Sequence, residues 1–144
     1  MTQVNISVET IANLVTMQLT NNNTAQPFYF DRQPGAPFAV PAGYSFVITD
    51  VIINPQVTSF AAGQFFLVVI TADGGRSITV QSDGHMTHLA LASGLVVPAP
   101  STPSPGAKGL SARNTTFSTG PVEVQVLGYF VRVATGLGVG QPFV

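Results

Sequence analysis

The sequence has very few charged residues, and it contains no cysteine and no tryptophan. Only 8% of its 144 residues are Asp, Glu, Lys or Arg, whereas about 25% is usual for a soluble domain. Because charge normally keeps a monomer soluble, neutral polar side chains must cover much of the surface here. Such groups lose less free energy than ions when they leave water. We therefore expect a surface that packs against other chains.

Other absences exclude several classes of function. Without cysteine there is no disulfide framework and no thiolate metal site. No apolar run approaches the ~20 residues of a membrane-spanning helix, so no membrane partner is expected. Nucleic-acid binding is not expected either, because the basic residues are scattered and form no stripe that could face phosphates. These residues are Arg32, Arg76, Lys108, Arg113 and Arg132.

The chain instead carries the pattern of an all-β domain. It is 45% hydrophobic and rich in Val, Ile, Thr and Phe, so it is able to bury a core. Short apolar or alternating runs are separated by Gly, Pro, Asn and Asp, which is typical of an antiparallel jelly-roll-like β-sandwich. The run 64–71 is almost continuously apolar and is expected to be buried on both faces. The other expected strands are 28–30, 38–40, 44–53, 77–82, 85–91, 94–98, 110–117 and 122–133.

Three segments are distinguished by composition. Residues 1–24 form an N-terminal arm or edge segment, whose apolar residues fit either helical or strand spacing. Residues 25–134 form the jelly-roll domain, with a proline-rich loop at 98–109 that is expected to be a semi-rigid finger. Residues 135–144 form a glycine-rich tail. Ordering glycine costs entropy, yet an apolar end gains by burial, so the tail either docks on a neighbouring subunit or frays. The possible contact residues are Pro142, Phe143 and Val144.

No catalytic, cofactor or metal site is predicted. His85 and His88 are the only histidines, and residues three apart on a strand face opposite sides, so within one chain they cannot chelate one ion. A Gly-x-Ser-x-Gly nucleophile motif is absent. Among the acids, Asp50 is expected to end a strand, and Glu123 to face outward beside Arg132. Turn chemistry and solvation account for the remaining acids, Glu9, Asp31, Asp73 and Asp83.

A sugar site is the alternative, because jelly rolls often serve as lectins. Asp73, Arg76 and Asn114 are expected in loops, where they could contact a glycan. Lectin sites usually offer an aromatic face as well. The tyrosines all lie in apolar strands and are expected to pack in the core; they are Tyr29, Tyr44 and Tyr129.

Residues 37–133 resemble small jelly-roll proteins of bacteria and phages. The resemblance lies in a Pro-Gly turn leading into a long strand over 40–51, a central "GLVVP" run at 94–98 and a closing strand over 124–131 that contains "GYFV". This layout is similar to that of the tumour necrosis factor and complement-type jelly rolls, which form trimers. The resemblance implies an architecture and three-fold association, and it transfers no ligand-binding residue.

The sequence therefore favours a non-enzymatic structural protein. We expect a homo-oligomer, in particular a trimer, within a surface assembly such as the decoration (cement) layer of a phage capsid. A multivalent, lectin-like carbohydrate-binding module is the alternative, in which avidity compensates for weak single sites. The amino end lacks the basic and apolar segments of a secretory signal peptide. We accordingly expect synthesis in the cytoplasm and a location in a virion or another extracellular assembly.

Overall fold

A computed structural model describes residues 8–16, 18–19, 24–31, 35, 37–56, 65–72, 76–99, 109–115 and 121–133. Within these ranges the chain is built from β-strands, and no helix there is long and apolar enough to cross a membrane. The strands are β1 (Val8–Thr16), β2 (Gln26–Phe30), β3 (Tyr44–Pro55), β4 (Phe66–Ala72), β5 (Ser77–Ser82), β6 (Thr87–Pro98), β7 (Leu110–Asn114) and β8 (Val122–Arg132).

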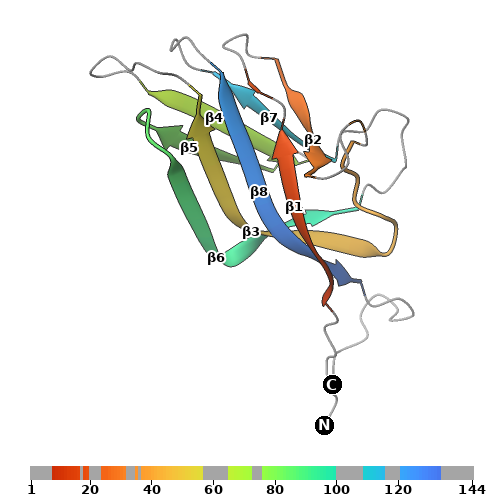
Figure 1. Cartoon of the computed structure of the whole chain (residues 1–144). Helices are drawn as coiled ribbons and strands as arrows, with labels where there is room; N and C mark the ends of the chain where they lie inside the picture. The colour runs from red at the N-terminus through yellow and green to blue at the C-terminus, as the bar shows by residue number, and fades with distance from the viewer. Residues whose placement is uncertain are drawn as a thin grey trace.

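All eight strands belong to one antiparallel sheet with the order β5-β4-β7-β2-β1-β8-β3-β6. The sheet folds over on itself (Figure 1). We call β1, β8, β3 and β6 the front half and β2, β7, β4 and β5 the back half; pairing between β1 and β2 joins them. The sheet nearly closes into a barrel-like sandwich, and the pairing within each half is that of a jelly roll. The predicted fold class is therefore confirmed.

The core lies between the two halves and is filled by alternate residues of each strand. An aromatic cluster occupies one part of it. The ring of Phe38 lies with its centroid 5.0 Å from that of Phe46 and 5.7 Å from that of Phe30, and Phe130 packs 5.2 Å from Phe46. Edge-to-face contacts of this kind add to the free energy gained by burying apolar area. Phe38 thus belongs to the core, although the predicted strand over 38–40 does not form.

The N-terminal segment is part of the sheet rather than an arm or an edge. β1 lies between β2 and β8 and pairs with both. Ala12, Leu14 and Thr16 are buried, whereas Ile11 is 81% exposed. The spacing of buried residues is therefore two, so the helical alternative was wrong. The strand alternative, which the spacing favoured over residues 15–20, was right in type but lay too late in the chain, because the strand runs over Val8–Thr16.

Two strand predictions need correction. β4 is not buried on both faces: its side chains alternate between buried and half-buried, because a two-layer sandwich covers only the inner face of each sheet. The runs 85–91 and 94–98 form the single strand β6. They are joined through Gly94, whose φ of 69° lies in the left-handed region that glycine adopts at low cost. Opposite this region the register of β3 shifts between Ile48 and Asp50.

Candidate functional site

The outer face of the front half carries a continuous apolar row. Tyr129 of β8 lies opposite Ile11 of β1 on one side and Val47 of β3 on the other, and Val47 lies opposite Val96 of β6. Directly opposed side chains in an antiparallel pair are neighbours on the same face. The row, which we call the front row, therefore crosses all four strands. Ile11 is 81% and Val96 41% exposed, whereas Val47 is buried, so the row is open to water mainly at its two ends.

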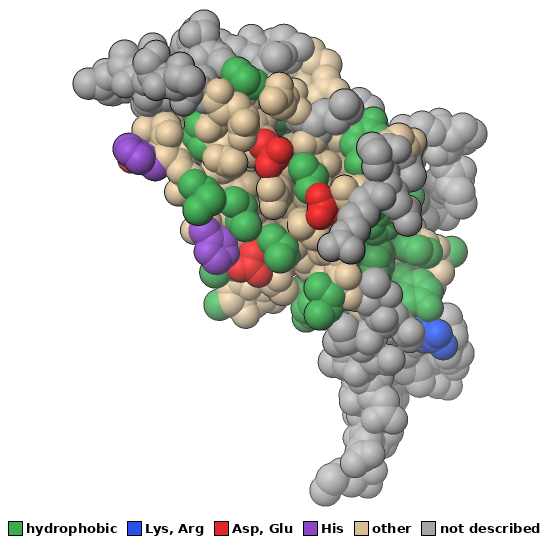
Figure 2. Space-filling view, viewed as in Figure 1, with side chains coloured by type: hydrophobic (Ala, Val, Ile, Leu, Met, Phe, Trp, Pro, Cys, Tyr) green, Lys and Arg blue, Asp and Glu red, His purple; other side chains and the backbone are tan. Residues whose placement is uncertain are grey.

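Apolar side chains continue on both sides of the front row. Leu127 and Ile52 face outward from β8 and β3, and both are half-buried. Ala90, which is small and exposed, lies opposite Asp50 on β6. Figure 2 shows that hydrophobic and neutral polar side chains make up most of this face, with charged groups few and apart. The small number of charged residues in the sequence therefore corresponds, on this face, to a surface that is partly apolar.

Asp50 and His88 form an ionisable pair on this face. The Nε2 atom of His88 lies 2.7 Å from Oδ1 of Asp50. Asp50 does not end a strand as predicted: it lies within β3, directly after the bulge at Thr49. The pKa of the Asp50 carboxyl is lowered, first by a hydrogen bond with the Thr49 side chain and second by the hydrogen bond with His88. The carboxylate is thus held in its ionised form.

Glu123, the other described acid of this face, lies near the opposite end of β8 from Arg132. It accepts a hydrogen bond from Nε2 of Gln125 at 2.7 Å. Arg132 donates to the Tyr44 hydroxyl at 3.2 Å, and its guanidinium carbon lies 5.7 Å from the centre of that ring. The prediction that Glu123 lies beside Arg132 was therefore wrong, since each strand residue adds about 3.3 Å.

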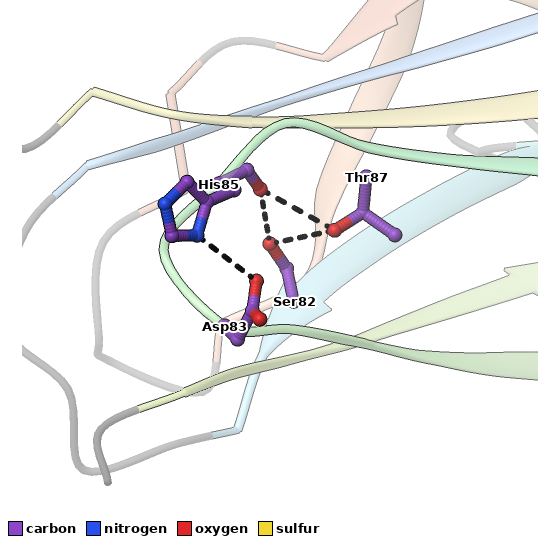
Figure 3. A network of polar contacts seen from close by, with 4 residues as sticks. All are labelled: Ser82, Asp83, His85 and Thr87. Carbon is purple, nitrogen blue, oxygen red and sulfur yellow. Dashed lines mark hydrogen bonds and ion pairs between the residues drawn. The ribbon is translucent and has the colours of Figure 1, made fainter. Parts of the chain in front are cut away.

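Ser82, Asp83, His85 and Thr87 form a polar network at the turn between β5 and β6 (Figure 3). Its residue types are those of a catalytic triad, but its geometry is not. The Ser82 hydroxyl donates to the backbone oxygen of His85 at 2.9 Å, and the Thr87 hydroxyl donates to Ser82 at 3.0 Å. A nucleophile must contact the imidazole itself. Ser82 is moreover 1% exposed, so this network closes the turn rather than presenting a hydroxyl to substrate.

The two histidines have separate carboxylate partners. Nδ1 of His85 lies 3.5 Å from Asp83, whereas His88 pairs with Asp50. Among the residues that the structure describes, no three His, Asp or Glu side chains gather closely enough to hold a metal ion.

The predicted sugar-contact residues do not come together in the described part of the chain. Asp73 lies outside the described residues. Arg76 is exposed just before β5, and its backbone oxygen accepts from the Ala72 amide. Asn114 is not in a loop: it ends β7, lies opposite Val68, and is fully buried. A glycan therefore has no access to the Asn114 side chain, because strand alternation turns it into the core.

The tyrosine prediction was right for one residue of three. Tyr44 packs against the core, with its ring 6.4 Å from that of Phe130. Tyr129 lies in the front row instead, and Tyr29 points away from the buried Phe28 beside it on β2. The predicted tail contacts Pro142, Phe143 and Val144, like most of the proline-rich loop at 98–109, lie outside the described residues.

The sequence analysis did not predict the front row, although one part of its residue pattern can be recognised in the sequence. In β8 the inward residues are Val122, Val124 and Val126, but the outward Leu127 and Tyr129 are apolar as well. An excess of apolar residues at outward positions was detectable. Alignment of the row across four strands was not, because it depends on pairing register. Comparison with protein-family models and with curated proteins found no match for this chain.

Proposed function

We propose that this protein is a non-enzymatic structural protein that assembles with copies of itself through the outer face of the front half. The front row is the observation that carries the proposal. An isolated exposed apolar residue is ordinary, whereas a contiguous apolar patch on a soluble protein marks an interaction site. The front row has this character at its two ends, where Ile11 and Val96 are exposed, while Tyr129 is half-buried and Val47 is buried between its neighbours.

The energetics favour burial of this face. Fully burying a Val, Leu or Ile side chain is worth about 1.5–3 kcal/mol. Ile11, at 81% exposure, has most of that gain still available. Charged groups oppose burial, but the described acids of this face are few: Asp50 and Glu123 on its strands, and the exposed Asp31 at its edge, beside Asn13 of β1. Asp50 is already paired with His88.

The narrower version of the proposal is a trimer that belongs to a surface assembly, in particular the decoration layer of a phage capsid. The resemblance in layout to trimeric jelly rolls and the scarcity of charge support this version. A shell component needs neutral faces that pack against neighbours, and it needs no catalytic group. Burial of about 800 Å² per partner is usual for a stable contact, and the front row with its apolar surroundings would lie at the centre of such a contact.

The first test is the native mass of the purified protein. We expect sedimentation equilibrium at micromolar concentration to give a multiple of the 15.0 kDa chain mass. The double substitution Ile11→Lys with Val96→Lys places two ammonium groups on the front row. We expect it to weaken assembly by at least about a hundredfold, equivalent to roughly 2.7 kcal/mol.

The matched control is Thr79→Lys with Gln81→Lys. Both residues are exposed on β5, on the outer face of the back half, so this variant adds the same charge elsewhere. It should keep the mass of the unmodified protein. A monomeric protein at all concentrations would refute the proposal. Equal weakening by the two double variants would show that net charge, rather than the front row, controls association.

A further inference from the structure

The pair formed by His88 and Asp50 lies within the area that subunits would cover. Asp50 lies opposite Leu127, two residues along β8 from Tyr129 of the front row. His88 lies opposite Ile52, which lies opposite Gln125, four residues along β8 from Tyr129. Alternate strand residues are about 7 Å apart, so both lie within about 14 Å of the row. A contact of about 800 Å² is roughly 28 Å across, and if it is centred on the front row it reaches both side chains.

We propose that assembly takes up a proton at His88, so that subunits associate more tightly at mildly acidic pH. This inference rests on the proposed function, because it concerns the same face. Uncovered, the pair is in contact with water: the His88 side chain is 55% and the Asp50 side chain 31% exposed. A neighbouring subunit removes that water, and the cost of doing so depends on the net charge of the pair.

The direction of the effect follows from the charge that is buried. With a neutral imidazole the pair carries the single negative charge of Asp50, whereas with an imidazolium it is a net-neutral ion pair joined by a 2.7 Å contact. Burying an uncompensated charge costs more than burying a hydrogen-bonded ion pair. Covering the pair therefore favours the protonated form. By linkage, the state that binds more protons gains stability as the pH falls.

Among the residues that the structure describes, the surroundings of His88 contain no cation that would oppose its protonation. Ile52 lies opposite it on β3, and Gln125 lies beyond Ile52 on β8. Among the described side chains of this face there is no Lys or Arg between β1 and β6. The other titratable groups to be considered around His88 are Asp50 on β3, Glu123 and Tyr129 on β8, and the Asp83–His85 pair in the turn that precedes β6.

Two properties define the pH window. Histidine is the side chain that ordinarily changes charge between pH 5 and pH 8. The pKa of Asp50 is lowered by Thr49 and His88, so its carboxylate stays ionised throughout that window. Association should therefore strengthen from pH 8 towards pH 5.5. It should weaken again only at more acidic pH, where Asp50 itself takes up a proton.

The experiment measures the concentration of half-assembly by sedimentation at pH 8 and pH 6 for the full chain. We expect that concentration to fall about tenfold at pH 6, as proton linkage permits. His88→Gln should remove the dependence, leaving a change below about twofold. His85→Gln is the matched control and should keep it, because His85 lies in the turn and pairs with Asp83.

Asp50→Asn gives the most specific test, because it should reverse the direction in which assembly depends on pH. Without the carboxylate, a protonated His88 would be buried as a lone positive charge, so assembly of this variant should weaken at pH 6. A role for the pair in folding alone would not produce that reversal. An assembled protein whose pH dependence survives in His88→Gln would overturn this inference and leave the proposed function standing. A protein that stays monomeric at both pH values would overturn both.

Discussion

The two outer faces of the sandwich differ in their exposed side chains, although both are built from strands of one sheet. The front half exposes apolar side chains, with Ile11 and Val96 the most prominent. The back half exposes hydroxyl and amide groups: Ser77, Thr79 and Gln81 all face water on β5. Its remaining outward residues include Thr71 and Ser111, which lie opposite each other, and the exposed Arg113. Leu67 and Val69 also face outward on β4, but both are half-buried.

This difference shows that a scarcity of charge is not by itself an interaction signal. Both faces are poor in ions and both mix apolar with hydrogen-bonding side chains, but the strongly exposed Ile11 lies on the front half. Hydroxyl and amide groups bind water without charge, so the back half can remain exposed. The front half cannot do so at equal cost, since its row of apolar side chains is contiguous. The assembly that the sequence predicts is thereby assigned to one face.

Removing the scaffold beneath the front face should have the largest effect. A Cβ atom at Gly128 of β8 would meet the backbone oxygen of Val47 and the Phe46 ring, and a backbone atom cannot move aside cheaply. We expect Gly128→Ala to destabilise the chain by about 3 kcal/mol and Gly128→Val to prevent folding. Urea denaturation followed by circular dichroism measures the first, and loss of the β spectrum reports the second.

Gly43→Ala is the control for that substitution. Gly43 has a φ of +82° but nothing within 4 Å of an added Cβ, so only backbone strain of about 1 kcal/mol is expected. If Gly43→Ala costs as much as Gly128→Ala, the close packing of β8 against β3 does not explain the requirement for glycine.

The same contrast explains what the sequence could and could not predict. β5 and β8 were found because apolar and polar residues alternate in them, as in the clear series Ile78, Val80 against Thr79, Gln81. The segment containing β1 was ambiguous because Ile11 and Val15 face outward while Leu14 faces inward. Apolar residues on both sides of a strand imitate helical spacing. The outward apolar residues that belong to the candidate site are thus the reason why β1 could not be predicted from sequence as a strand.

Buried polar residues account for another part of what was missed. Asn114 was expected within the strand 110–117 and also as a loop residue able to contact a glycan, but it ends β7 and points into the core. The pairing of His88 with Asp50 was also out of reach, since it joins residues 38 apart in the chain. Pairing register decides both cases, and a single sequence does not specify register.

The seam between β1 and β8, within the front half, depends on Thr16, and its removal should have an intermediate effect. The Thr16 hydroxyl donates to the backbone oxygen of Val124 at 3.0 Å and accepts from the Val124 amide at 3.2 Å, with the side chain 2% exposed. Thr16→Val preserves the shape but leaves both Val124 groups without this partner. We expect a loss of about 1–3 kcal/mol in urea denaturation. An unchanged midpoint would mean that the seam does not rely on this side chain.

The smallest effect should come from Thr79→Val on the back half. Thr79 is exposed on β5, opposite Val69, and the two side chains are similar in shape. Because it lies on an outer face and valine suits strands at least as well as threonine, we expect the free energy of unfolding to change by less than about 0.5 kcal/mol. The mass at equilibrium should also be unchanged, since the added side chain would adjoin only the half-buried Val69 and Leu67 and would be flanked on β5 by Ser77 and Gln81. Stronger association in this variant would show that the back half also contacts neighbouring subunits, and the distinction between the two faces would then fail.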